Sequence, residues 1–345
     1  MARAALLASG LLSLSWLPFG AAAEEPPISP DPTSFLRSLP GLTPSDLENL
    51  ERGQMVARVI DTGDRSEILS LAVMRVRTTP ARVLERLRRA EGRPREPWIL
   101  QVGRLGAKPS PRDLQALTLD PGEVKHLGKC RVNDCRVRLS ADAIERFRKE
   151  VDGSSASRAA LADALFRETL SAYAASYLAR GDAGLIRYDN NDDPVRIADS
   201  LRLLMGRADF LRDAAPDILA YLEGFPQGRP ADEEDVFYWL KEKFWLLNVV
   251  SLNHVAIVAR GTPPGRLVLA VTKQLYASHY YESSLGAIAF VEGPAGSGYL
   301  AFINRSRADI RRSGFNWFER AVLKYLVRGR LEGQLKYLRL ELEGR

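Results

Sequence analysis

The chain has 345 residues, with 49 Lys and Arg against 43 Asp and Glu, a formal net charge of +6 and only two cysteines. Charges of both signs are interspersed and no run of five like charges occurs, which argues against a nucleic-acid-binding protein. The length is sufficient for one large domain or two modest ones with a sizeable core.

The first 23 residues have the pattern of a cleavable secretory signal. Arg3 supplies the positive region, residues 4–19 are largely apolar, and residues 21–23 are three alanines. The alternative is a membrane anchor, but two serines and a proline interrupt the apolar run, which is shorter than the roughly 20 residues that span a bilayer. We expect cleavage after Ala23 and a periplasmic or secreted protein.

The two cysteines, Cys130 and Cys135, flank an Asn-Asp pair of turn type. In the oxidising compartment that an export signal implies, such a pair most simply forms a local disulfide. A metal site needs more ligands, and only His126 is close in the sequence. We therefore expect a structural disulfide, no metal site and no cofactor.

The N-terminal part of the mature chain begins with a proline-rich segment, residues 24–43, which we expect to be a tether. A short helix is predicted over 44–52. Two runs rich in β-branched and apolar residues, 53–61 and 67–77, predict strands, and the Thr-Gly-Asp-Arg sequence at 62–65 predicts the turn of a hairpin between them.

The middle of the chain is predicted to be mostly helical. Thr79-Pro80 opens a helix with one apolar face, and a third strand is expected over 98–103. Residues 111–223 then have helical patterns, with the last two helices near 194–204 and 209–221. We interpret 111–223 as a helical insertion.

The last third is rich in Val, Ile, Leu and Tyr. Strands are predicted over 246–259, 267–281, 285–291 and 299–305, separated by Pro- and Gly-rich turns, as in an antiparallel meander. An amphipathic helix over 316–342 closes the chain. The fold class is therefore α+β.

A strand hairpin, a helix opened by Thr-Pro-Ala-Arg-Val-Leu-Glu-Arg-Leu, a sheet and one long C-terminal helix together resemble the helix-grip fold of START-like lipid-binding and polyketide-cyclase-type proteins. Residues 53–90 resemble its opening and 246–342 its closing part, while 111–223 departs from the usual all-sheet centre. The resemblance implies one domain over 44–345, a curved antiparallel sheet gripped by the C-terminal helix, and a cavity for a hydrophobic or amphipathic molecule. Segments such as Lys-Gln-Leu-Tyr-Ala-Ser-His-Tyr-Tyr also resemble those of secreted bacterial proteins to which no function is attached.

Ligand contacts are predicted on the strand over 267–281. Alternation places Lys273, His279 and Tyr281 on one otherwise apolar face. Since buried charges need partners, these side chains would form the polar end of a cavity and hold a carboxylate or phosphate. The alternative is an edge strand whose long side chains reach water. Arg305, at the end of the last strand, is a second anion contact or a turn residue.

The predicted function is binding of a hydrophobic or anionic amphipathic small molecule. One alternative is an enzyme of hydrolase or cyclase type that uses the same cavity with His279 as general base. Another is an envelope-associated protein whose cationic C-terminal helix contacts a membrane or a partner through its apolar face. The aromatic and basic residues concerned are Trp317, Phe318, Tyr325, Arg320, Lys324 and Arg328.

Overall fold

The structure is a computed structural model that describes residues 31–89, 97–151, 155–308 and 317–344; of residues 155, 156 and 317–326 only the backbone is described. The predicted signal over residues 1–23 lies outside the described residues, as do the side chains of five of the six C-terminal residues named above. The elements follow in chain order as α1 (Pro32–Ser38), α2 (Pro44–Glu51), β1 (Val56–Ile60), β2 (Glu67–Val76), α3 (Pro80–Arg88), β3 (Ile99–Arg104), η1 (Pro111–Leu114), α4 (Pro121–Leu127), α5 (Ala141–Glu150), α6 (Ser155–Arg180), η2 (Gly181–Gly184), β4 (Arg187–Tyr188), β5 (Val195–Arg196), α7 (Ile197–Gly206), α8 (Asp209–Ala214), α9 (Pro216–Gly224), β6 (Glu234–Phe244), β7 (Leu247–Arg260), β8 (Leu267–Ala277), β9 (Tyr281–Glu292), β10 (Gly298–Ala308) and α10 (Trp317–Glu343).

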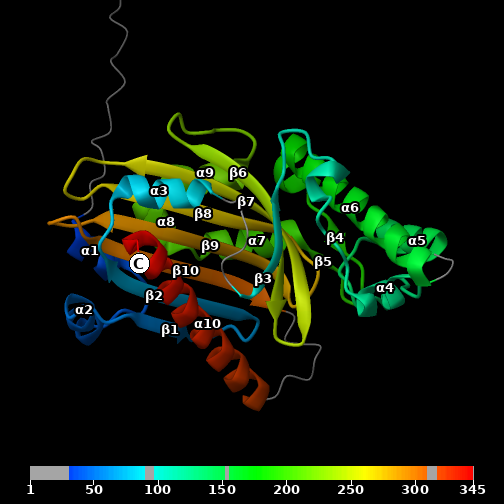
Figure 1. Cartoon of the computed structure of the whole chain (residues 1–345), viewed down its shortest axis with the longest axis horizontal. Helices are drawn as coiled ribbons and strands as arrows, with labels where there is room; N and C mark the ends of the chain where they lie inside the picture. The colour runs from blue at the N-terminus through cyan, green and yellow to red at the C-terminus, as the bar shows by residue number, and fades with distance from the viewer. Residues whose placement is uncertain (1–30, 90–96, 152–154, 309–316, 345) are drawn as a thin grey trace, which may run out of the picture.

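One eight-stranded sheet organises the molecule, in the order β1-β2-β10-β9-β8-β7-β6-β3 with every neighbouring pair antiparallel. The chain leaves the sheet after β3, forms the helices from η1 to α9, and returns as β6, which pairs with β3. The helical segment therefore connects two adjacent strands (Figure 1). The α+β class with an antiparallel sheet and a C-terminal helix, predicted from the sequence, is confirmed.

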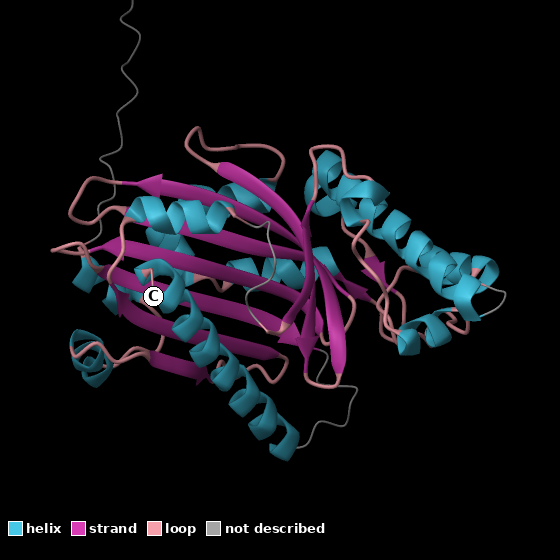
Figure 2. Ribbon diagram, viewed as in Figure 1, coloured by secondary structure: helices cyan, strands magenta, loops and turns pink. Residues whose placement is uncertain are grey.

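Helices cover both faces of the sheet (Figure 2). On one face, α3 and α10 pack on a layer of apolar side chains from β2, β8, β9 and β10. Leu331 and Leu335 of α10 are 4% and 1% exposed, and Met74 beneath them is fully buried. The apolar residues of the C-terminal helix thus have the spacing expected for a helix lying across a sheet.

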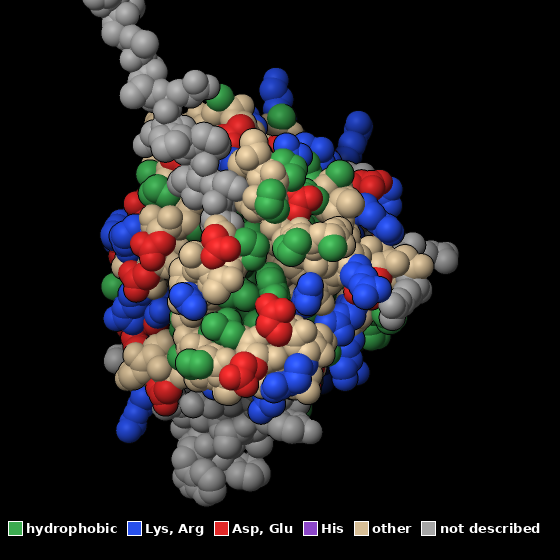
Figure 3. Space-filling model, turned by 90° about the vertical axis from the view of Figure 1, so that its left-hand side faces the viewer, with side chains coloured by type: hydrophobic (Ala, Val, Ile, Leu, Met, Phe, Trp, Pro, Cys, Tyr) green, Lys and Arg blue, Asp and Glu red, His purple; other side chains and the backbone are tan. Residues whose placement is uncertain are grey.

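On the opposite face, α1 and α7 pack on β9, and the larger hydrophobic core joins the sheet to the helices of the 111–224 segment. Helices α4, α5 and α6 extend beyond the sheet at the right of Figure 1. The end of the molecule that carries α1 and α2 shows basic and acidic side chains intermixed (Figure 3), as the interspersed charges of the sequence predict.

The tether predicted over 24–43 is wrong for its described part. Residues 32–38 form α1, opened by Pro32 and by Asp31, whose side chain accepts a hydrogen bond from the backbone of Ser34 at 3.0 Å. Phe35 and Leu36 are 5% and 4% exposed, so the segment belongs to the core. Pro32 marks a helix start rather than an unfolded linker.

Three further elements differ from the sequence prediction. Strand β6 was not predicted at all, although its Glu-Asp-Val-Phe-Tyr-Trp-Leu segment is rich in residues typical of strands. The single helix predicted over 209–221 is two helices, because Pro216 begins a new one. The strand predicted over 267–281 ends at Ala277, and residues 278–280 form the turn into β9.

The predicted disulfide is confirmed: Cys130 and Cys135 are bonded, with their Cα atoms 4.6 Å apart. Among the described residues, no helix combines the length and the apolar character that crossing a bilayer requires.

Candidate functional site: an arginine-lined pocket

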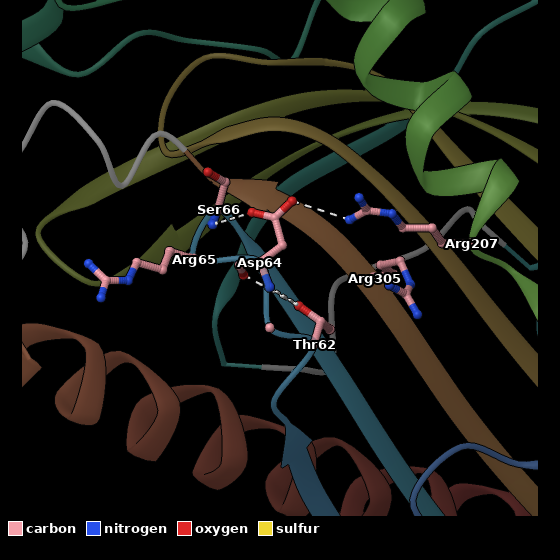
Figure 4. Close-up of a pocket in the computed structure, with 7 residues that line it drawn as sticks. Thr62, Asp64, Arg65, Ser66, Arg207 and Arg305 are labelled. Atoms are coloured by element: carbon pink, nitrogen blue, oxygen red, sulfur yellow. Dashed lines mark hydrogen bonds and ion pairs between the residues drawn. The ribbon is translucent and has the colours of Figure 1, made fainter.

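An open pocket of about 830 Å³ lies at the end of the sheet where β1 turns into β2 (Figure 4). It is formed by the β1–β2 turn, the residue that follows α7, and the last part of β10. Its lining residues are Thr62, Gly63, Asp64, Arg65, Ser66, Arg207 and Arg305.

The β1–β2 turn is shaped by short polar side chains that bond their own backbone. Asp61 Oδ1 accepts the Gly63 N–H at 3.0 Å, and Asp64 Oδ1 accepts the Ser66 N–H at 2.9 Å. Gly63 has φ +77°, a conformation that glycine adopts without steric cost. These bonds orient the Asp64 carboxylate toward Arg207 (Figure 4).

Glu67, the first residue of β2, is the centre of an arginine cluster beside the pocket. Its side chain is fully buried. Its Oε2 accepts from Arg305 Nη1 at 2.9 Å, and its Oε1 accepts from Nη1 of both Arg307, at 3.3 Å, and Arg207. A buried carboxylate needs such partners, since an unpaired one is strongly disfavoured.

The charged residues that line the pocket are three arginines and one aspartate. Burial alone would raise the pKa of Asp64, but the Ser66 N–H and the guanidinium groups of Arg207 and Arg307 outweigh it and lower that pKa. The hydrogen bond to Asp64 and the charge of Glu67 raise the pKa of Arg207. Arg65 is exposed, and the described residues provide it with no hydrogen bond or ion pair.

The geometry leaves guanidinium donors available at the pocket. The hydrogen bonds described for Arg207 and Arg305 involve only Nη1, and their side chains are 44% and 17% exposed. A guanidinium presents five donors in a planar fork that matches a carboxylate or a phosphate. The site can therefore bind a small anion bidentately.

Arg305 is the only one of the four predicted ligand contacts that lines this pocket. The side chain of Lys273 lies on the face of β8 that the sequence predicted, together with Leu267, Leu269 and Val271. Its Nζ donates to Asp182 Oδ1 at 2.5 Å and to the Leu222 carbonyl at 2.6 Å, and burial lowers its pKa. The edge-strand alternative is wrong, because β8 is an interior strand and Lys273 is fully buried.

His279 and Tyr281 lie apart from Lys273. His279 is in the β8–β9 turn and its Nε2 lies 2.7 Å from Glu123 Oε1 of α4. Tyr281 packs against Phe244 at 5.3 Å on the opposite face of the sheet, and burial raises its pKa. The pairing of β7 with β8 has a register shift that leaves Leu275 without a partner. This bulge interrupts the alternation of side chains on which the prediction for His279 and Tyr281 was based.

A buried polar network centred on His254 of β7 was not predicted from the sequence. Tyr177 OH lies 2.9 Å from His254 Nδ1, and His254 Nε2 lies 2.5 Å from Asp235 Oδ1. Tyr221 donates to the other oxygen of Asp235 at 2.6 Å. Burial lowers the pKa of His254 despite the opposing effect of Asp235, so the neutral ring accepts from Tyr177 and donates to Asp235.

Asp235 is on β6, and because this strand was not predicted from the sequence, the network could not be predicted either. His254 is fully buried, as is Tyr177, and the network joins α6 and α9 to the sheet. We interpret it as a structural cluster that fixes the helices on this face.

The described residues contain no group of three or more His, Cys, Asp and Glu side chains arranged to hold a metal ion. Comparisons of the chain with protein-family models, with curated proteins and with solved structures found no match, so its function has to be inferred from its own residues.

Proposed function

We propose that the protein binds a small amphipathic molecule through its carboxylate or phosphate group, which occupies the arginine-lined pocket. The observation that carries this proposal is an open pocket of about 830 Å³ whose lining includes Arg65, Arg207 and Arg305. Two of these guanidinium groups are held in place by Glu67, so a ligand would meet donors that are already oriented.

The site is at the end of the sheet, not under the C-terminal helix. In a helix-grip protein the ligand would lie between sheet and helix, and we retain that architecture as a proposal for this chain. The described part of this interface is filled by side chains such as Met74, Leu331 and Leu335. Lys273 of β8 and Arg305 of β10 are both paired with Leu285 of β9, which lies between them. The two predicted ligand contacts are therefore separated by an apolar residue.

We propose that the protein acts outside the cytoplasm. The alanine-rich end of the apolar N-terminal segment and the Cys130–Cys135 disulfide both support this location, because disulfides persist in oxidising compartments.

Titration calorimetry with dodecanoate and dodecyl phosphate tests the proposal, with dodecyl maltoside as the uncharged comparison. We expect both anions to bind and Arg207→Gln to weaken binding about tenfold or more, since a charge-assisted bidentate contact is lost. Arg202→Gln is the matched control, because Arg202 is on α7, the helix that Arg207 directly follows, is 70% exposed and does not line the pocket.

The proposal fails if neither anion binds, if dodecyl maltoside binds equally well, or if the Arg207 and Arg202 variants have the same affinity as the wild type. An unchanged unfolding midpoint of Arg207→Gln would show that a loss of affinity is not a loss of fold.

A further inference from the structure

The turn between β6 and β7 exposes three consecutive apolar residues. Phe244 pairs with Leu247, so Trp245 and Leu246 form a two-residue hairpin turn. Trp245, Leu246 and Leu247 are 37%, 77% and 40% exposed. We call these three residues the Trp245 tip. Single exposed leucines are ordinary on a protein surface, but a contiguous apolar projection is not.

The backbone of the tip is unusual for the residue that it carries. Trp245 has φ +47°, in the left-handed region that hairpin turns normally fill with Gly or Asn. A bulky aromatic residue at this position has a conformational cost. A cost of this kind at an exposed position is typical of sites retained for function.

Aromatic side chains behind the tip support it. The ring centroid of Phe244 is 5.4 Å from that of Tyr280 and 5.3 Å from that of Tyr281, while Trp245 is 6.1 Å from Tyr280. Phe244 is only 8% exposed. The tip therefore projects from a packed aromatic base formed by two adjacent hairpin turns.

Basic residues lie at the same end of the sheet. Because the strands are antiparallel and consecutive in this region, the β6–β7 turn, the β8–β9 turn, the end of β10 and the β1–β2 turn all fall at one end. Lys243 and Arg65 belong to this end and are exposed, and the described residues give their side chains no ion pair; Arg207 is also exposed but pairs with Asp64 and Glu67. An apolar projection accompanied by cations is complementary to a surface of anionic lipids.

We propose that the Trp245 tip inserts shallowly into an anionic lipid surface and holds the protein there. This inference goes beyond the ligand pocket and does not depend on it. Tryptophan favours the boundary between lipid headgroups and acyl chains, and the two leucines would enter the acyl region. Three residues on a convex turn bury far less than the about 1,000 Å² of a stable protein interface, which favours a lipid surface over a protein partner.

Co-sedimentation of the full-length protein with vesicles tests this inference. The probes are vesicles of phosphatidylcholine alone and of phosphatidylcholine mixed with phosphatidylglycerol. We expect binding to the anionic vesicles and an about tenfold or greater loss of partitioning in the double variant Leu246→Ser/Leu247→Ser, because two leucines no longer leave water. Because Leu247 is only 40% exposed, the single variant Leu246→Ser is measured as well; Leu246 is 77% exposed, so its unfolding midpoint should not fall while its partitioning does.

The matched control is Leu340→Ser. Leu340 is 50% exposed and lies near the end of α10. This part of α10 is at the opposite end of the sheet from the Trp245 tip, because Glu343 accepts a hydrogen bond from the N–H of Arg77, which follows the last residue of β2. Its variant should bind vesicles like the wild type. The inference is overturned if the wild type binds neither kind of vesicle, if it binds both equally, or if the double variant retains full binding.

Discussion

The two faces of the sheet are stabilised in different ways. The face beneath α10 is packed mainly by aliphatic side chains, and the ion pair of Arg330 with Glu242 on this face is only partly buried, with both side chains 19% exposed. The opposite face buries ionisable groups at its centre, including Lys273 and His254. Apolar contacts are tolerant of orientation, whereas buried charges and hydrogen bonds require particular partners. The helices from η1 to α9 are therefore fixed in position by pairing as well as by buried area.

Substituting the buried lysine gives the largest expected effect on this contrast. Lys273→Met removes the partner of Asp182 and leaves the Leu222 carbonyl without its donor. We expect the free energy of unfolding to fall by about 3 kcal/mol in urea denaturation, because a half-buried carboxylate loses its counter-charge and a buried carbonyl loses its donor. The exposed pair of Arg202 with Asp199 is the control, and Arg202→Met should cost less than about 1 kcal/mol. Equal effects of the two variants would contradict the contrast.

On the α10 face the expected cost comes from a cavity. Leu335 is 1% exposed in the layer between α10 and the sheet. Leu335→Ala should lower the free energy of unfolding by about 2–4 kcal/mol. Since no buried charge is removed, the loss should be the same at pH 5 and pH 8. A strongly pH-dependent loss would show that this face also depends on ionisation.

The smallest expected effect, when stability is compared one pH unit at a time, is a dependence on pH. Burial and the neighbouring Asp235 raise the pKa of Glu233 to about 8, although Arg229 opposes this. The folded state therefore holds a proton that the unfolded state releases near pH 4.5. The stabilisation is complete below that pH and is lost as the pH rises toward 8, by at most about 1.4 kcal/mol per pH unit.

Glu233→Gln replaces the protonated carboxyl by an uncharged isostere and should flatten this decline in urea denaturation between pH 5 and pH 8. The adjacent Glu234→Gln is the matched control, because the Glu234 side chain is 38% exposed. If both variants keep the decline of the wild type, Glu233 is not its source.

Much of the fold could be predicted because local chemistry specifies it. Thr79 accepts the Arg82 N–H before Pro80, as the cap of α3 requires, and the Thr62–Arg65 turn joins β1 to β2 as expected. The ends of helices and strands were predicted less accurately than their existence. Alternation along β8 correctly placed Lys273 on the inner face but failed beyond Leu275, where a register shift against β7 changes the facing of the later residues.

The candidate site could be predicted only in part. Arg305 was expected to bind an anion because it ends the last strand. Arg207 is almost one hundred residues earlier in the sequence, after α7, and Glu67 begins β2. Nothing local indicates that these three side chains meet, because their approach depends on β10 pairing with β2 and on α7 packing against β9 and β10.

The sequence alone determined the α+β class, the strand hairpin, the C-terminal amphipathic helix and the Cys130–Cys135 disulfide. Each of these depends on residues near one another in the chain. Only the tertiary structure decided that α1 is part of the core, that β6 completes the sheet, and that Lys273 is paired with Asp182. The physical reason is that the partner of a buried polar group is chosen by long-range packing, which hydrophobic periodicity does not encode.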